Sequence, residues 1–488
     1  MDDTKDSMNV AVSGPCIAKR GRMLERMLVF GLLGLTGCAT AGGALTPETS
    51  TAQASAFVGV TVVGMTRSAE SMPDQTVVIR DGQIQAVGPR GEVTVPVDAV
   101  RIDGTGKYLM PGLADMHVHL EYFEDPSILK LFLANGVTTV RNMDGRPRIL
   151  EWKKQIEEGT LPGPLIYTAG PLLDGDPPLR TDNLVVRNAE EARAAVIAQK
   201  AAGYDFIKVY TNLSAEAYEA VLATAWENDM PVAGHVPRAV GLKRAISGQA
   251  SIEHLGDYAD AVERDDSPFR SRDAWFKRFL GMPVDRAKAD LLGKEQARQG
   301  AWTVPTLVQA DKALAPPDLM RQWLAAPEVS YMDAEMRAMW EELNRRVTAR
   351  MDDEDWRRVA LGRQNRLMLV RALHESGAQL LAGSDTPNPF VVPGFALREE
   401  LKNLVEAGLT PWAALATSTR DAARFADQLD GRGSVETGQR ADLLLLESNP
   451  LEDVTNVGKL TGVMVHGRWF SRDELTRLLD SVRQPATR

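Results

Sequence analysis

Short apolar runs recur through the middle of the chain, and stretches of helical composition separate them. Alternating strands and helices are typical of a parallel α/β architecture. Eight such units between residues 111 and 433 predict a (β/α)₈ TIM barrel with insertions, and an open doubly wound sheet is the alternative. The predicted strands are Leu113–Leu120, Val137–Asn142, Leu165–Pro171, Phe206–Thr211, Pro231–Val236, Ser251–Leu255, Trp302–Val308 and Gln379–Asp385.

The segments between these runs carry helical signals. Ala189–Ala202 is rich in alanine, glutamate and arginine, and Ser214–Asn228 opens on a serine that can cap a helix. Two long insertions, Gly256–Gly300 and Gln309–Gly377, follow the later strands. Part of the first, Asp257–Lys277, is either a helix of the outer ring or a lid over the site.

Both ends of the folded region are rich in strands. Phe57–Asp103 contains several runs of valine and isoleucine, and Asp81-Gly82 between two of them predicts a hairpin turn. Each end is too small to form its own core, so we expect the two to pack together as one small β-sandwich. The predicted divisions are 57–110 and 434–475 for the sandwich, 111–433 for the barrel and 476–488 for a C-terminal tail.

The N-terminal region has the pattern of an export signal. Basic residues precede the apolar run Met27–Leu35, which is too short to span a bilayer but suits a signal peptide. Leu35-Thr36-Gly37-Cys38 resembles the bacterial lipoprotein box, in which the cysteine is lipidated; a plain signal peptide is the alternative. We expect a signal peptide over 1–38, a tether over 39–56 and an exported, periplasmic protein held at the outer membrane through Cys38.

Composition and charge narrow the class of protein. The 488 residues include 44% hydrophobic and 25% charged positions, as in folded proteins, and carry a net charge of −10. This acidity argues against a nucleic-acid partner, because a phosphate-binding surface is normally basic. The two cysteines, Cys16 and Cys38, provide no disulfide framework. We expect a small-molecule substrate and membrane contact through the lipid anchor alone, and homo-oligomerisation stays open.

Candidate metal ligands gather at the predicted strand ends. Four of the six histidines fall there, and two of them, one residue apart on the first strand, share a face. In a barrel the chemistry lies at the carboxyl ends of the strands, so these side chains should converge. Imidazole and carboxylate groups are common metal ligands, so the pattern predicts a metal site. Its members are His117, His119, Lys208, His235, His254 and Asp385.

This set, with the histidine pair following Met110-Pro111-Gly112, resembles the metal-dependent amidohydrolase superfamily over about residues 57–470. Closer features resemble the branch that contains imidazolonepropionase-like hydrolases, metal-dependent prolidases and ochratoxin amidases. These features are Gly136–Arg141, Gly234–Pro237, Ser251–His254 and Gly383–Thr386.

The resemblance implies two zinc ions. Their implied ligands are His117, His119 and Asp385 for one ion and His235 and His254 for the other. Lys208, as N6-carboxylysine, would bridge the two, because a free ammonium has no lone pair to offer a cation whereas a carbamate has anionic oxygens. A single-metal site with an unmodified Lys208 is the alternative.

The implied activity is hydrolysis of a C–N amide bond, in a dipeptide or an N-acyl amino acid, by a hydroxide that bridges the metals. Asp385 would take the proton and pass it to the leaving amine. Tyr210 is expected to contact the substrate carbonyl or carboxylate, and Arg238 to bind that carboxylate. Hydrolysis of a cyclic amide, lactone or ester is the alternative on the same site. A non-catalytic ligand-binding lipoprotein is the alternative of another class.

Overall fold

The computed structural model describes residues 54–66, 69–272, 274–349, 351–427 and 431–483. The predicted signal peptide, Cys38 and nearly all of the tether lie outside these residues. Within the described ranges, no helix is both long enough and apolar enough to cross a membrane.

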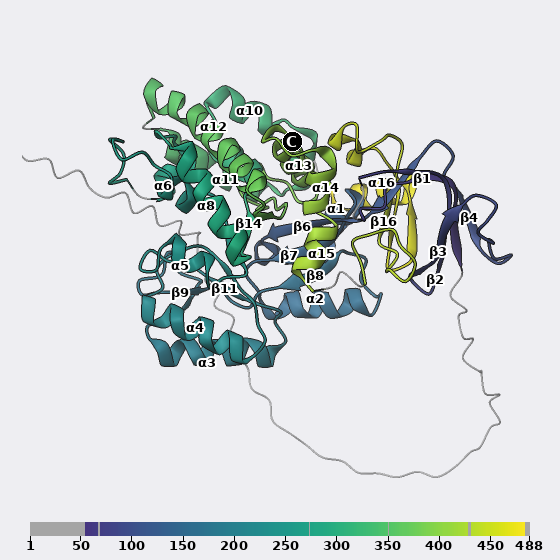
Figure 1. Cartoon of the computed structure of the whole chain (residues 1–488), viewed down its shortest axis with the longest axis horizontal. Coiled ribbons are helices and arrows are strands. Elements are labelled where there is room, and N and C mark those ends of the chain that lie inside the picture. Colours follow the sequence, from purple (N-terminus) through teal and green to yellow (C-terminus); the bar gives the residue numbers. More distant parts are fainter. Residues whose placement is uncertain (1–53, 67–68, 273, 350, 428–430, 484–488) are drawn as a thin grey trace, which may run out of the picture. The chain divides into compact units, whose positions relative to one another are not determined.

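One sheet of eight strands draws on both ends of the described chain, and Figure 1 shows the purple and yellow strands together. The strand β5 joins the two ends, because it pairs with β1 on one side and with β16 on the other. The predicted hairpin turn is present, and Asp81 and Gly82 have φ values of 53° and 74°. The order is β18 (Arg468–Ser471), β17 (Leu460–Val465), β16 (Leu443–Leu446), β5 (Tyr108–Pro111), β1 (Ser55–Val62), β2 (Met72–Arg80) and β3 (Gln83–Pro89), with β4 (Val100–Asp103) beside β1.

The eight strands predicted for the middle of the chain are all present and lie in two parallel sheets. Isolated bridges from Ala169 to Phe206 and from Val118 to Thr386 link the ends of these sheets. This topology is consistent with a TIM-barrel-like domain. One sheet holds β6 (Leu113–Val118), β7 (Val137–Asn142) and β8 (Leu165–Thr168). The other has the order β10 (Leu184–Val185), β9 (Leu173–Asp174), β11 (Ile207–Val209), β12 (Val232–Gly234), β13 (Ser251–Glu253), β14 (Trp302–Val304) and β15 (Gln379–Leu380).

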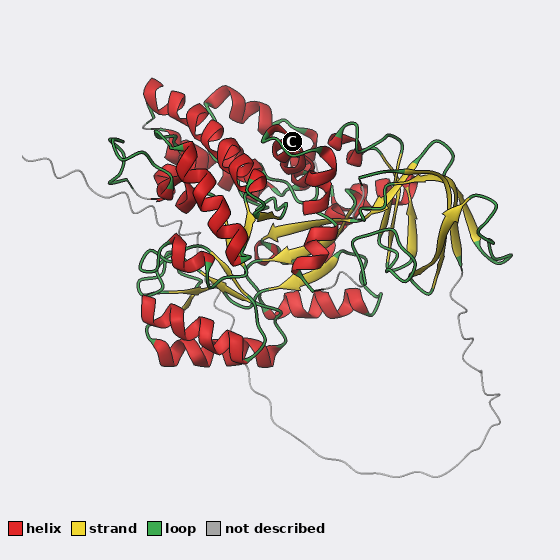
Figure 2. Cartoon of the chain, viewed as in Figure 1, coloured by secondary structure: helices red, strands yellow, loops and turns green. Residues whose placement is uncertain are grey.

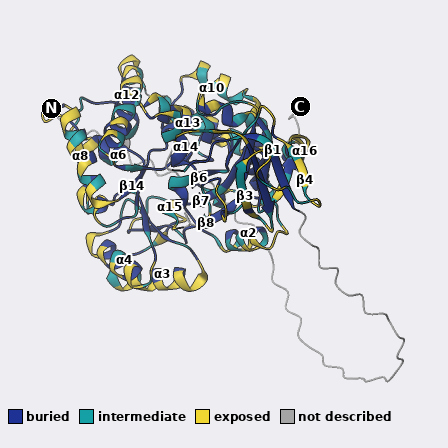
Figure 3. Cartoon of the chain, turned by 45° about the vertical axis from the view of Figure 1, so that its right-hand side comes forward, coloured by how far each residue is buried: buried dark blue, intermediate teal, exposed yellow. Residues whose placement is uncertain are grey.

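Helices surround these strands (Figure 2), and the exposed residues lie on the outward faces of helices such as α3, α4 and α8 (Figure 3). The α-helices are α1 (Leu129–Ala134), α2 (Pro147–Glu157), α3 (Ala189–Ala202), α4 (Ala215–Glu227), α5 (Leu242–Ile246), α6 (Gly256–Ala261), α7 (Ala274–Phe279), α8 (Arg286–Gln299), α9 (Leu307–Lys312), α10 (Pro317–Leu324), α11 (Ala334–Thr348), α12 (Asp353–Glu375), α13 (Ala396–Glu406), α14 (Pro411–Thr417), α15 (Arg420–Phe425) and α16 (Arg472–Val482). Short 3₁₀ helices span Leu120–Tyr122, Pro126–Ile128, Pro327–Tyr331 and Val454–Gly458.

Local sequence explains the helices that were predicted. Ser214 caps α4, because its hydroxyl accepts a hydrogen bond from the Ala217 amide at 3.1 Å. Asn188 caps α3 in the same way, and Gly203 ends that helix in a left-handed conformation with φ of 89°.

Residues 476–482 of the expected C-terminal tail continue helix α16. The helix begins with a capping box, in which Ser471 and Glu474 each bind the other's backbone amide. Its residues Leu475 and Val482 are buried. The capping box and these buried contacts make the segment a helix that packs on the fold.

A single residue, Gly112, connects β5 of one sheet to β6 of the other. Pro111 ends β5, Leu113 begins β6, and the Gly112 amide between them donates to the Asp442 carbonyl at 2.8 Å. A Cβ at Gly112 would lie 2.1 Å from Thr138 Oγ1, so only glycine fits there. This passage leads directly to the first two histidines of the candidate site.

Candidate metal centre

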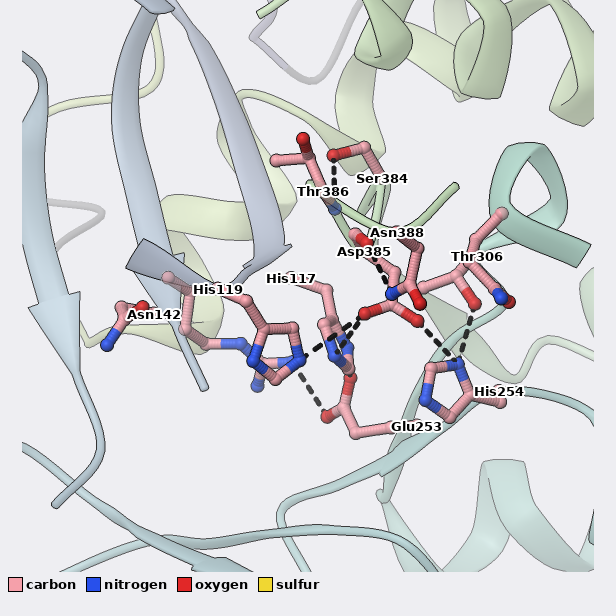
Figure 4. A network of polar contacts seen from close by, with 12 residues as sticks. His117, His119, Asn142, Glu253, His254, Thr306, Ser384, Asp385, Thr386 and Asn388 are labelled. Carbon is pink, nitrogen blue, oxygen red and sulfur yellow. Dashed lines mark hydrogen bonds and ion pairs between the residues drawn. The ribbon is translucent and has the colours of Figure 1, made fainter. Parts of the chain in front are cut away.

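The structure places each of the six predicted ligands at or just beyond the carboxyl end of its strand. Figure 4 shows Asp385 with side chains of the histidine group around it. Two of the ligands come from the end of β6, and the others come from four further strands. They are His117 in β6, His119 after it, Lys208 in β11, His235 after β12, His254 after β13 and Asp385 after β15.

Asp385 is the centre of the cluster. Its Oδ1 atom lies 3.4 Å from His117 Nε2 and 3.3 Å from His119 Nε2, and its Oδ2 atom lies 3.7 Å from His254 Nδ1. Ligand atoms of His117, His254 and Asp385 all lie within 4.8 Å of one another. Three buried groups with this spacing are able to hold one metal ion.

His235 and Lys208 complete the cluster on the side of β11 and β12. The ring centroids of His235 and His254 are 4.8 Å apart. Lys208 is 1% exposed, and its Nζ atom has no hydrogen-bond partner. Burial lowers the pKa of Lys208 to about 8. A buried amine without a partner is costly, so this position fits a lysine that carries a modification.

The residues present fit a bound cation. His117 Nε2 is buried and makes no hydrogen bond, although it faces Asp385. Burial lowers the pKa of His117 to about 4 and holds the pKa values of His235 and His254 well below their usual range. A neutral imidazole has the lone pair that a metal ion requires.

His119 differs from the other histidines in its surroundings. Its Nδ1 atom lies 2.7 Å from Glu121 Oε1. Burial alone would lower the pKa of His119, but Glu121 and Asp385 raise it to about 9. The carboxylate of Glu121 therefore orients the ring so that Nε2 faces Asp385.

A buried ion pair between Glu253 and Arg141 holds the Nδ1 side of the His117 ring. Its Nδ1 atom lies 2.7 Å from Glu253 Oε2, and Arg141 Nη2 donates to Glu253 Oε1 at 2.7 Å. Burial alone would raise the pKa of Glu253, but Arg141 and His117 hold it well below its usual range. An ionised Glu253 requires a proton on Nδ1 of His117, which leaves Nε2 free for a metal ion.

The backbone is strained where three loops meet the centre. His254, Thr306 and Asp385 have φ values of 69°, 48° and 61°, which non-glycine residues adopt at a cost of about 1–3 kcal/mol each. The Asp385 amide donates to the His117 carbonyl at 2.7 Å, and Thr306 Oγ1 lies 2.7 Å from His254 Nδ1. These contacts hold the strained residues in place.

The two predicted substrate contacts differ in position. Tyr210 lies beside the cluster, with its ring centroid 4.2 Å from that of His235, and burial raises its pKa to about 12. Arg238 is exposed, and its backbone amide donates to the Thr211 carbonyl at 2.9 Å. Its role in substrate binding stays a prediction.

Sequence reasoning missed Glu253, Arg141 and also Arg278, whose Nη2 atom lies 3.0 Å from His254 Nδ1. Arg141 and Glu253 are charged residues within apolar strands. This pattern indicates a buried ion pair, so the sequence contains a signal for them. Arg278 stands in a long insertion among other arginines, and its sequence context gives no such signal.

Known proteins resemble the whole chain or part of it. It is 23% identical to an ochratoxinase of Aspergillus niger over 468 residues, which covers 82% of each protein. It is also 28% identical to an adenine deaminase of Chelativorans sp. over 186 residues, but this match spans only 30% of the deaminase and 35% of the chain.

Solved structures show the same fold. A bottromycin amidohydrolase has a TM-score of 0.70 and 27% identity, and the match covers 88% of this chain and 90% of that one. A candidate prolidase from Bifidobacterium longum has a TM-score of 0.64 and 25% identity, with coverage of 88% and 99%. The sequence profile of the Amidohydrolase family matches residues 108–470. The chain belongs to the amidohydrolase family, as the residues at its strand ends predicted.

Proposed function

We propose that this protein is a binuclear zinc hydrolase that cleaves the C–N amide bond of a dipeptide or an N-acyl amino acid. One observation carries the proposal: four histidines, Asp385 and an unpartnered buried Lys208 meet at the ends of five parallel strands. The ochratoxinase, prolidase and bottromycin amidohydrolase among its relatives support an amide substrate.

The proposed architecture is a closed (β/α)₈ barrel beside a β-sandwich made from both chain ends. The bridges from Ala169 to Phe206 and from Val118 to Thr386 support closure of the eight parallel strands. The sheet shared by β1 and β16 through β5 supports a joint terminal domain.

Two sets of residues would hold the metal ions. The proposed ligands are His117, His119 and Asp385 for one ion, His235 and His254 for the other, and carboxylated Lys208 between them. When bound, zinc ions make a coordinated water acidic enough to supply hydroxide at neutral pH, and they polarise a substrate carbonyl. The unpartnered atoms His117 Nε2 and Lys208 Nζ support this assignment.

Asp385 and Tyr210 have separate roles in the proposed amide cleavage. Asp385 accepts the proton of the attacking water and delivers it to the leaving nitrogen, so that a C–O bond forms, the C–N bond breaks and the amine departs neutral. Tyr210 donates a hydrogen bond to the substrate; burial raises its pKa and keeps the hydroxyl protonated.

The alternative substrates for the same groups are cyclic amides, lactones and esters, in which an alcohol or a tethered amine replaces the leaving amine. A non-catalytic ligand-binding lipoprotein is the alternative of another class. The strained Asp385 and the buried ligand set argue against it, because a protein without catalysis has no chemical need to maintain them.

The test is a substrate screen of the protein prepared with zinc and bicarbonate. We expect two zinc ions per chain by elemental analysis, and turnover of at least one dipeptide or N-acyl amino acid in a library that also contains lactones. Absence of bound metal would contradict the zinc centre. Turnover confined to lactones or cyclic amides would contradict the linear amide substrate.

We also propose that the protein is exported and anchored at the outer membrane through a lipid on Cys38. The sequence before Cys38 supports this proposal, since it combines basic residues, a short apolar run and a lipoprotein box.

A further inference from the structure

Arg278 brings a positive charge from the first insertion to the candidate centre. It lies in α7, within the insertion that follows β13. Its Nη2 atom lies 3.0 Å from His254 Nδ1 and 3.4 Å from Asp385 Oδ2. The same atom donates to the amide oxygen of Gln309. An arginine from a distant helix is therefore part of the site that the strand ends build.

The charge of Arg278 is poorly compensated. Its side chain is 16% exposed, and its Nε atom is buried without a hydrogen-bond partner. Within the described residues, Asp385 is the one carboxylate that forms an ion pair with this guanidinium. Gln309 is a neutral amide and the imidazole of His254 carries no negative charge, so neither supplies an anion. A buried cation of this kind requires an anion as its partner.

The position of Arg278 is fixed from outside the centre. The neighbouring Lys277 is buried, and its Nζ atom forms ion pairs with Asp260 and with Glu263, the latter at 2.7 Å. Arg366 Nη1 donates to the Arg278 carbonyl at 2.9 Å. These contacts fix α7 in the fold. Because the guanidinium already faces the site, binding of a substrate would cost little side-chain entropy.

The arginine contacts His254, whose ring lies 4.8 Å from that of His235, and the ring of Tyr210 lies 4.2 Å from His235 on the same side of the centre. A guanidinium presents two parallel N–H groups that match the two oxygens of a carboxylate. Arg278 has an unpartnered Nε beside its Nη2, so it retains part of this donor pair for a ligand. Arg180, by contrast, already pairs with Asp182 at 3.1 Å.

We infer that Arg278 determines specificity by binding the free carboxylate of the substrate. This inference rests on the proposed amide hydrolysis and on Asp385 serving as a metal ligand there, which leaves Arg278 in need of another anion. It assigns to Arg278 the role that the sequence predicted for the exposed Arg238. The centre then prefers an amide that carries a free carboxylate over neutral amides and lactones.

A kinetic comparison tests this assignment on the zinc-loaded enzyme. The substrates are N-acetyl derivatives of the twenty amino acids, each as the free acid and as the C-terminal amide. We expect kcat/KM to favour the free acids, and Arg278→Met to reduce that preference about tenfold or more, mainly through KM. Arg278→Lys should retain part of it, because the charge remains.

Binding of two inert ligands separates this inference from the proposed function. Benzyloxyacetate carries a carboxylate and 2-benzyloxyethanol does not, and neither contains a bond that the enzyme would cleave. Calorimetry should show tighter binding of the carboxylate to the wild type and loss of the difference in Arg278→Met. This arm decides the role of Arg278 even if no amide is hydrolysed.

Matched variants exclude simpler explanations. Arg270→Met removes an exposed arginine of the same insertion that pairs with Asp265, and it should leave the preference unchanged. Zinc content and melting temperature of Arg278→Met should equal those of the wild type. The inference is overturned if the wild type shows no preference for the carboxylate, if Arg278→Met retains it, or if Arg238→Met abolishes it instead.

Discussion

Glu253 Oε2 lies 2.7 Å from His117 Nδ1, and neither side chain is exposed to solvent. Because Glu253 also accepts hydrogen bonds from Arg141 and from the Ser251 hydroxyl, its carboxylate is fixed and ionised. The pair therefore sets which nitrogen of His117 faces the centre before any metal ion arrives.

Replacement of Glu253 should weaken metal binding without removing a ligand. In Glu253→Gln we expect zinc affinity to fall about 10–100-fold, because the amide no longer enforces the proton on His117 Nδ1. Competition with a chelator measures the affinity, and ¹⁵N NMR of the histidine rings reports the tautomer. Glu219→Gln, at an exposed ion pair with Arg244, is the control. An unchanged affinity and tautomer in Glu253→Gln would refute this positioning role.

Lys208 should be essential for metal loading. In Lys208→Ala we expect turnover and the second zinc ion to be lost, because no group remains to bridge the two metal ions. Wild-type protein should take up zinc more fully with bicarbonate than without it, as a carbamate requires. The exposed Lys154 provides the control Lys154→Ala. Undiminished turnover in Lys208→Ala, or zinc uptake independent of bicarbonate, would rule out the carbamate.

Glu400 should make the stability of the fold depend on pH. It is fully buried, and burial raises its pKa to about 8. The folded state then binds a proton that the unfolded state has released, so stability falls as pH rises from about 4.5 to 8, by at most about 1.4 kcal/mol per pH unit. Above pH 8 the loss is complete, and below about 4.5 it is absent.

The variant Glu400→Gln removes this titration but keeps an oxygen for the Val308 amide, which donates to Glu400 at 2.8 Å. The melting temperature of Glu400→Gln minus that of the wild type should be larger at pH 8.5 than at pH 5.5. Measurements on chelator-treated protein exclude effects of metal binding. An equal difference at both pH values would show that Glu400 does not titrate in this range.

The predicted lipid anchor is open to a direct test. Wild-type protein expressed in a Gram-negative bacterium should be found in the outer-membrane fraction, with its mass increased by lipid. Cys38→Ser should abolish both properties, whereas Cys16→Ser, in the part predicted to be removed, should change neither. Finding Cys38 unmodified in the mature protein would contradict the predicted lipid anchor.

The predictable part of this molecule is local in sequence. Apolar periodicity located all eight middle strands, and each candidate ligand, such as His235 or Asp385, lies within a few residues of the strand that carries it. Their convergence follows once parallel strands share an edge.

The remaining features depend on contacts between distant segments. Glu253 meets His117 across 136 positions, and Arg278 reaches Asp385 across 107. Neither pairing leaves a periodic pattern, because each arises from how an insertion or a strand packs in three dimensions. Helix α16 differs, because its capping box of Ser471 and Glu474 is a local signal in the sequence.

The tight passage at Gly112 has a consequence for biosynthesis. Strand β5 pairs with β16, whose residues are made more than 330 positions later, and Gly112 binds Asp442 just before that strand. His117 and His119 are therefore synthesised long before Asp385, whose amide donates to the His117 carbonyl, and before Asp442, whose carbonyl binds Gly112. The complete ligand set exists only once Asp385 has been made, and Gly112 gains its partner only once Asp442 has been made, so we expect metal to bind late in synthesis or after it, in the compartment in which the polypeptide folds.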